Sequence, residues 1–144
     1  MPVVKSLGDA IHPERPNAKV VGCGGAGCNT LRDIPSIPGL DLVGINDEPH
    51  PSLLGIENAV YLKRESLKAI ALSSEKVSKH LLTEQEKEIA NHIRGSDIVY
   101  IVSGMGGEVG TWAPTVVAKV ARKLGTLSIA MTTLPFKVES ERRT

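Results

Sequence analysis

The 144-residue chain is poor in aromatic side chains and in cysteine. One Trp, two Tyr and one Phe make up 3% of the residues, too few for the base-stacking surfaces of proteins that bind single-stranded nucleic acid. The two cysteines, Cys23 and Cys28, lie in the same glycine-rich stretch. A disulfide framework or a zinc site would need more such residues. This cysteine usage favours a reducing compartment, so we expect a cytoplasmic protein.

The chain also lacks an excess of charge and a long apolar run. Its 17 Lys and Arg residues are interspersed with 16 Asp and Glu residues, and the net charge is +1. Surfaces that bind nucleic acid or membranes are usually much more basic. No run is long enough for a membrane helix, and the N-terminus has no signal-peptide pattern. We therefore expect neither a nucleic-acid partner nor a membrane partner.

Glycine, by contrast, is concentrated in two stretches that each follow an apolar run. Residues 22–29 read GCGGAGCN, and residues 104–111 read GMGGEVGT. Glycines let backbone N–H groups approach an anion, and a helix N-terminus adds partial positive charge. Two such turns in one short chain predict a phosphate-binding crevice.

The remaining pattern alternates strands and helices. Strands are expected at 18–21, 39–46, 58–62, 97–103 and 127–132, and the run at 97–103 is typical of a strand buried on both faces. Helical texture covers 66–95, with a capping box from Thr83 to Glu86, and a further helix starts at Ala113-Pro114 and ends at Gly125. This order predicts an α/β fold: a mostly parallel, Rossmann-like sheet with helices on both faces. We assign 1–17 to an N-terminal extension and 18–144 to the domain.

An acidic turn, Asn46-Asp47-Glu48, follows the second strand. It lies roughly 20 residues past the first glycine stretch, where dinucleotide-binding folds place an acid that binds ribose. The same residues are equally compatible with a solvated turn. Glu48 and the generic pattern Gly22-x-Gly24-x-x-Gly27 leave a dinucleotide-binding oxidoreductase fragment as one alternative. No metal site is predicted, because His80 and His92 have no partners at ligand spacing.

Residues 19–143 resemble the N-terminal, nucleotide-binding half of the FtsZ branch of the tubulin/FtsZ GTPases. Five motifs in the same order carry the resemblance. They are KVVGCGGAGCN at 19–29; GIND at 44–47; RGSD at 94–97; GMGG at 104–107 with Gly110, Thr111 and the following Ala-Pro; and TLPF at 133–136 with Glu139 and Arg143.

The resemblance implies a guanine nucleotide, GTP or GDP, with magnesium, and a filament-forming relative related to cell division. It places the first loop on the α- and β-phosphates, the second loop on the phosphates with magnesium, and two later residues near the ribose. The implied binding residues are Gly24, Gly25, Ala26 and Asn29, then Gly106, Gly107, Gly110 and Thr111, then Glu139 and Arg143. It also implies a homo-oligomer or a full-length FtsZ-like partner.

The chain departs from the family pattern at several positions. Glu108-Val109 stands in place of Gly-Thr, Trp112 in place of the last glycine, Leu134 in place of an arginine, and residues 63–74 contain no glycine where the γ-phosphate loop belongs. The segments that supply the family's catalytic acids lie later than this sequence, so we expect no GTP hydrolysis by this chain alone and nominate no catalytic residue. A degenerate, non-enzymatic relative that acts as a protein-interaction or self-association module is the close alternative.

Overall fold

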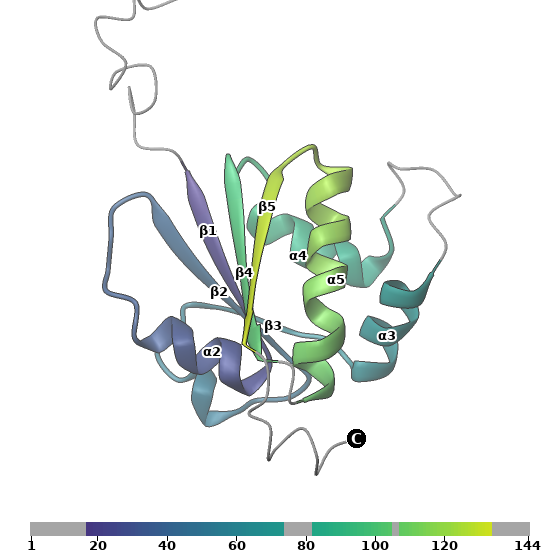
Figure 1. The fold of residues 1–144 in the computed structure, drawn as a ribbon, viewed down its shortest axis with the longest axis horizontal. Helices are drawn as coiled ribbons and strands as arrows, with labels where there is room; N and C mark the ends of the chain where they lie inside the picture. Colours follow the sequence, from purple (N-terminus) through teal and green to yellow (C-terminus); the bar gives the residue numbers. More distant parts are fainter. Residues whose placement is uncertain (1–16, 74–81, 105–106, 134–144) are drawn as a thin grey trace, which may run out of the picture.

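A five-stranded parallel sheet forms the centre of the fold (Figure 1). The computed structural model describes residues 17–73, 82–104 and 107–133. Its strand order is β3-β2-β1-β4-β5. The strands are β1 (Ala18–Cys23), β2 (Leu40–Asn46), β3 (Asn58–Tyr61), β4 (Ile98–Gly104) and β5 (Leu127–Thr133), and the helices are α2 (Gly24–Arg32), α3 (Arg64–Leu72), α4 (Glu84–Ile93) and α5 (Glu108–Lys123).

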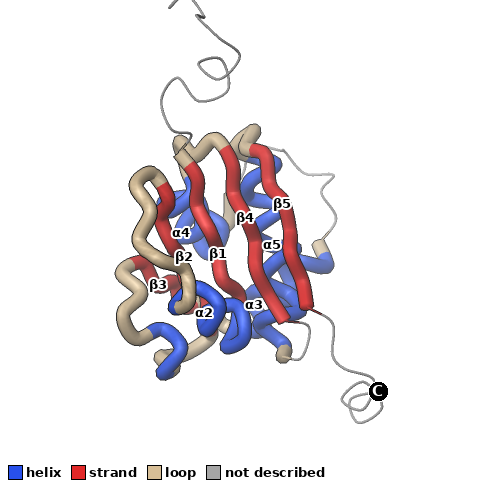
Figure 2. The backbone as a smooth tube through the Cα atoms, turned by 60° about the vertical axis from the view of Figure 1, so that its left-hand side comes forward, coloured by secondary structure: helices blue, strands red, loops and turns tan. Residues whose placement is uncertain are grey.

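Helices cover both faces of this sheet, as predicted. Figure 2 shows α2 in front of the strands and α3, α4 and α5 behind them. The main core lies between the sheet and α5, where Val99 and Ile101 of β4 meet Val116, Val117 and Val120 of the helix. Burial alternates along β4, so only one of its faces is fully enclosed. The prediction that this strand is buried on both faces was therefore wrong for the face that α2 covers only in part.

The ends of two helices follow local sequence rules. Thr83 accepts a hydrogen bond from the Glu86 backbone N–H while the Glu86 carboxylate accepts one from the Thr83 N–H, which confirms the predicted capping box. Gly125 follows α5 with a φ of 73°, as expected beyond a helix C-terminus. However, α5 begins at Glu108, so Pro114 lies inside the helix and not in its first turn. Residues 108–111 of the second glycine stretch thus form the first turn of α5.

Strand β5 leaves an apolar row uncovered. Leu127, Ile129 and Met131 are 61%, 42% and 49% exposed. In the sheet register they stand beside Ile98, Tyr100 and Val102 of β4, on the face opposite α5. On that face α2 packs over β1, β2 and β4, which leaves the β5 row outside its cover.

The predicted boundary between the N-terminal extension and the domain falls at Asn17, the first residue that the structure describes, so it stays a prediction. Among the helices that the structure describes, none is both long and apolar enough to span a bilayer.

Candidate functional site

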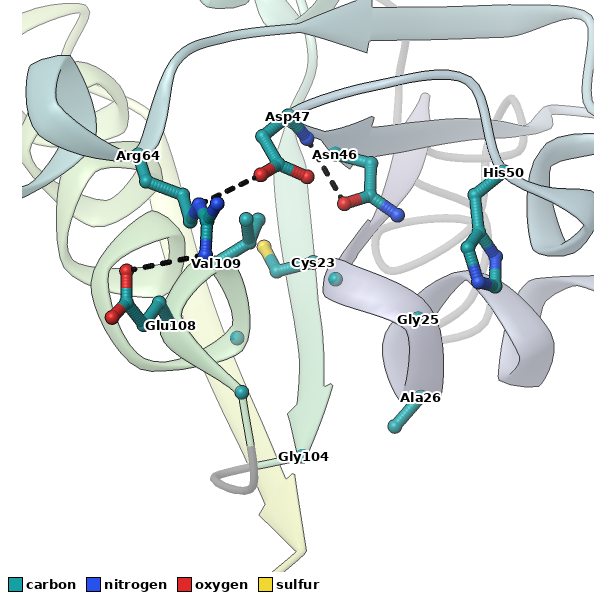
Figure 3. Close-up of a pocket in the computed structure, with 13 residues that line it drawn as sticks. Cys23, Gly25, Ala26, Asn46, Asp47, His50, Arg64, Gly104, Glu108 and Val109 are labelled. Atoms are coloured by element: carbon teal, nitrogen blue, oxygen red, sulfur yellow. Dashed lines mark hydrogen bonds and ion pairs between the residues drawn. The ribbon is translucent and has the colours of Figure 1, made fainter.

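A cavity of about 450 Å³ opens at the carboxyl ends of β1, β2 and β4, between the N-termini of α2 and α5 (Figure 3). Its position follows from the parallel sheet, in which the loops that leave the carboxyl ends of neighbouring strands meet at one edge. Its size is within the range of small-molecule sites, about 300–1,000 Å³. The cavity is therefore the candidate site for the crevice predicted from the two glycine stretches.

The structure brings several of the predicted binding residues together at this cavity and places others away from it. Gly24, Gly25, Ala26, Gly107 and Gly110 line the wall. Two do not belong to the wall: Asn29 is exposed on α2, and the Thr111 hydroxyl donates to the carbonyl of Gly107 at 2.6 Å. Three more, Gly106, Glu139 and Arg143, lie outside the described residues.

The glycines of the two stretches fall into two kinds. A Cβ added to Gly27 would lie 2.4 Å from the carbonyl oxygen of Val102, and one added to Gly110 would lie 2.3 Å from that of Gly104. No side chain fits at such distances, so these two glycines are required by helix–strand packing. At Gly107 an added Cβ would meet nothing within 4 Å, and at Gly25 only the His50 ring at 4.0 Å. These two leave backbone open to the cavity.

The first stretch carries no charged side chain, and its two cysteines are enclosed. Both cysteines are buried and unpaired, and the Cys28 thiol lies 3.5 Å from the carbonyl oxygen of Gly22, to which it donates. Burial raises the pKa of Cys28 to about 11 and also raises that of Cys23. A thiolate is the reactive form of cysteine, so both groups act as small packing residues.

The other side of the cavity is charged. The Arg64 Nε lies 2.9 Å from Asp47 Oδ2, and its Nη1 lies 3.7 Å from Glu108 Oε2 (Figure 3). The carboxylate of Glu108, which stands where the family pattern has a glycine, therefore faces a cation. Asp47 lies in the bend after β2 and lines the cavity, and its role at a ribose stays a prediction. Glu48, on which the dinucleotide alternative relied, is exposed and does not line the wall.

His50 closes the cavity beyond α2. Its Nδ1 accepts a hydrogen bond from the Ser52 backbone N–H at 3.1 Å, so in the neutral ring the proton resides on Nε2. The ring stands beside Gly25 in Figure 3. His50 thus presents a hydrogen-bond donor next to the open backbone of the first stretch.

Sequence reasoning missed Arg64 and His50. Each follows a strand, β3 and β2 respectively, at the edge where the glycine turns gather. Residues just after parallel strands share that edge, and this rule could have identified both.

In the described ranges, no cluster of three or more His, Cys, Asp or Glu side chains is arranged to hold a metal ion.

Trp112 has a structural place away from the cavity wall. It packs against the core from α5 while half covered, and the Lys68 ammonium lies 5.7 Å from its ring centroid. Cations over an indole ring are attracted by its electron-rich face. The side chain that replaces a glycine of the family pattern therefore joins α5 to α3.

Comparison with known proteins identifies the relatives of this fold and site. The model of the Tubulin/FtsZ family, GTPase domain, matches residues 45–144. Cell division protein FtsZ 1 from Thermococcus kodakarensis is 38% identical over 128 residues, covering 86% of this chain and 34% of that protein. The protein of the same name from Halobacterium salinarum is 38% identical over 141 residues, covering 95% of this chain and 36% of its own length.

Solved structures give the same result. A tryptophan-to-tyrosine mutant of FtsZ from M. jannaschii superposes with a TM-score of 0.65 at 30% sequence identity, covering 92% of this chain and 41% of that one. An empty FtsZ dimer from M. jannaschii superposes with a TM-score of 0.63, also at 30% identity, covering 92% and 40%. The chain thus spans about a third of the length of the curated relatives it matches.

Proposed function

We propose, since the chain belongs to the tubulin/FtsZ family of GTPases, that it binds GTP and GDP in the cavity between α2 and α5. One observation carries the proposal: the N-termini of two helices converge on a single cavity, and each contributes a glycine whose backbone is open to it. Helix N-termini combine free N–H donors with partial positive charge, so they favour phosphate groups.

The two stretches divide the phosphates between them in this proposal. Gly24, Gly25 and Ala26 supply donors from α2, and Gly107 and Gly110 supply them from α5. Asn29, Gly106 and Thr111 belong to the same proposal through the family pattern, as do Glu139 and Arg143 at the ribose.

A magnesium ion is also part of the proposal, because it neutralises phosphate charge when a nucleotide is bound. The described residues offer no cage of three or more ligands, yet magnesium often uses only one or two carboxylates and takes phosphate and water oxygens for the rest. Asp47, the less exposed of the two carboxylates at the cavity wall, fits this role.

We further propose that the chain on its own does not hydrolyse GTP. The acids at the described cavity wall, Asp47 and Glu108, both pair with Arg64, so neither is placed to accept a proton from an attacking water. Incubation with GTP and magnesium should release no phosphate above the buffer control. Steady release that stops in a Gly107→Val variant would contradict this part of the proposal.

Titration calorimetry with GTP and GDP tests the binding itself. Gly107→Val fills the open backbone of the second stretch and should abolish the heat of binding. Thr115→Val is the matched control, because Thr115 is exposed on the same helix and away from the cavity. An unsubstituted chain that gives no heat at millimolar nucleotide would defeat the proposed function.

Self-association, or pairing with a full-length FtsZ-like partner, is a second proposal, and the uncovered β5 row supports it. Exposed apolar rows on a sheet are common at interfaces between proteins. The Ile129→Ser variant should lower the mass measured by sedimentation at micromolar concentration, whereas Ile37→Ser, at an equally exposed isoleucine outside the sheet, should not. A monomeric mass for the unsubstituted chain across the concentration range would refute self-association.

A cytoplasmic location completes the proposal, supported by two free, buried thiols.

A further inference from the structure

The helix α3 brings an arginine to the cavity at a place where the family pattern has a glycine-rich loop. Arg64 is the first residue of α3, and it lines the cavity opposite the α2 turn (Figure 3). We propose that Arg64 is a phosphate-binding residue of this site, held ready by Asp47 and Glu108 until a nucleotide phosphate replaces Glu108 as its partner. This inference rests on the proposed nucleotide binding and adds the residue that neutralises the phosphate charge.

The position of Arg64 is fixed by the packing of α3 on α5. Leu67 and Ile70 are buried in the core, three residues apart on one face of α3. From α5, the Lys119 ammonium donates to the carbonyls of Ile70 at 2.9 Å and Ser73 at 3.0 Å, at the C-terminal end of α3. A cation is favourable at that end of a helix. These contacts, with the stacking of Lys68 on Trp112, hold α3 so that its first residue reaches the cavity.

The two carboxylates hold Arg64 unequally. The 2.9 Å contact with Asp47 is within hydrogen-bond range, but the 3.7 Å contact with Glu108 is too long for a hydrogen bond. The guanidinium carries five N–H donors, so it can keep Asp47 and still bind a phosphate oxygen. Glu108 is 66% exposed, and its carboxylate is free to turn to solvent when the phosphate arrives.

A cation at the cavity wall offsets the negative charge of the two carboxylates there. Asp47 and Glu108 repel a polyphosphate, and two like charges at about 4 Å repel by roughly 1 kcal/mol in water and more in a partly enclosed site. Within the described residues, Arg64 is the permanently charged cation that lines the cavity. Without Arg64, the backbone N–H groups that bind phosphate would lie near two carboxylates whose charge no arginine offsets.

Calorimetric titration of three variants with GTP, GDP and GMP tests the assignment. Arg64→Gln should weaken GTP binding by about 10- to 100-fold, the effect of losing one charged hydrogen bond, with a smaller loss for GDP and the smallest for GMP. Lys63→Gln is the matched control: it removes the same charge from the neighbouring, exposed residue, which does not line the cavity, and should change affinity by less than twofold. Glu108→Gln should strengthen GTP binding, because Arg64 then has one carboxylate fewer to neutralise.

The outcomes separate the inference from the proposed function. If the unsubstituted chain binds GTP and Arg64→Gln binds as well as Lys63→Gln, the assignment of Arg64 is wrong while nucleotide binding stands. If the unsubstituted chain binds neither GTP nor GDP, both proposals fail. Because a destabilised fold would weaken binding in any variant, the gain in Glu108→Gln is decisive: a loss of affinity there overturns the role of the pair even if Arg64→Gln fails to fold.

Discussion

The two glycine stretches share one plan and differ in their surroundings. In each, one glycine of the first helical turns touches a strand carbonyl, Gly27 at Val102 and Gly110 at Gly104, and another, Gly25 or Gly107, faces open space. The first stretch contains two buried thiols and no charged side chain, whereas the second carries Glu108 and faces Arg64 of α3. In both stretches, packing and access to the cavity therefore depend on different glycines.

The two stretches are also in contact with each other. A Cβ on Gly24 would lie 3.0 Å from the backbone nitrogen of Gly110, and Gly24 has a φ of 74°, a conformation that side chains other than glycine rarely adopt. The helix N-termini on either side of the cavity are thus part of one packed unit. A change at a packing glycine of one stretch should disturb the whole site, while a change at an open glycine should leave the packing intact and weaken ligand binding.

The largest loss of stability is expected when Gly27 or Gly110, the two glycines that pack against strand carbonyls, is replaced. Gly27→Ala places a methyl group 2.4 Å from the Val102 carbonyl oxygen, and the forced shift of α2 should lower the free energy of unfolding by about 3 kcal/mol. Gly110→Ala should cost a similar amount. Urea unfolding followed by circular dichroism measures both. A much smaller loss for Gly110→Ala would show that the second stretch is the looser of the two.

The next largest loss of stability is expected at Trp112, which joins α5 to α3. Trp112→Ala removes a half-buried ring from the α3–α5 contact and the stacking of Lys68, and should cost about 2 kcal/mol in unfolding free energy. Tyr61→Ala, at an exposed aromatic residue on the edge strand β3, should cost well under half as much. Equal losses in the two variants would mean that Trp112 contributes no more than surface packing.

Much of the fold could be predicted from sequence because its signals are local. The alternation of strands and helices, the capping box at Thr83 and the helix end at Gly125 each depend on residues close in sequence. The start of α5 was missed because Pro114 is typical of a first turn, whereas packing of the preceding residues, including buried Val109 and Gly110, extends the helix to Glu108. Tertiary contacts overrode the local rule there.

The site was less predictable because its charge depends on contacts between distant segments. The glycine stretches point to the phosphate crevice through backbone geometry alone, which a motif records. The pairing of Arg64 with Glu108 joins residues from two helices that meet only in the folded chain, so the sequence showed an uncompensated acid. The same reason hid the contact between Lys68 and Trp112.

An open glycine should separate stability from binding. Gly25→Ala replaces glycine inside α2 at a position without positive φ, where the new methyl meets only the His50 ring at 4.0 Å. Alanine favours the helix, so the unfolding free energy should rise by up to about 1 kcal/mol. The methyl group also covers backbone at the cavity wall, so GTP affinity should fall about tenfold in calorimetry. Unchanged affinity would place the phosphates away from α2 and break the parallel between the stretches.

The smallest effect is a loss of stability at high pH that comes from the buried thiol of Cys28 in the first stretch. Burial raises the pKa of Cys28 to about 11, while a thiol in the unfolded chain ionises near 8.5. The folded state therefore keeps its proton longer, and the stability that this thiol contributes is full below pH 8.5 and falls as the pH rises towards 11. Between pH 8 and pH 9 the loss should be about 0.7 kcal/mol for this group.

Urea unfolding at the two pH values, with a reductant present, measures that loss, and Cys28→Ala isolates it from the titration of other groups. The drop in unfolding free energy between pH 8 and pH 9 should be about 0.7 kcal/mol smaller in the variant, whatever its stability at pH 8. Equal drops would mean that solvent reaches the thiol and that the first stretch tolerates charge. The contrast with the second stretch, where Glu108 lies at the cavity wall, would then rest on Arg64 alone.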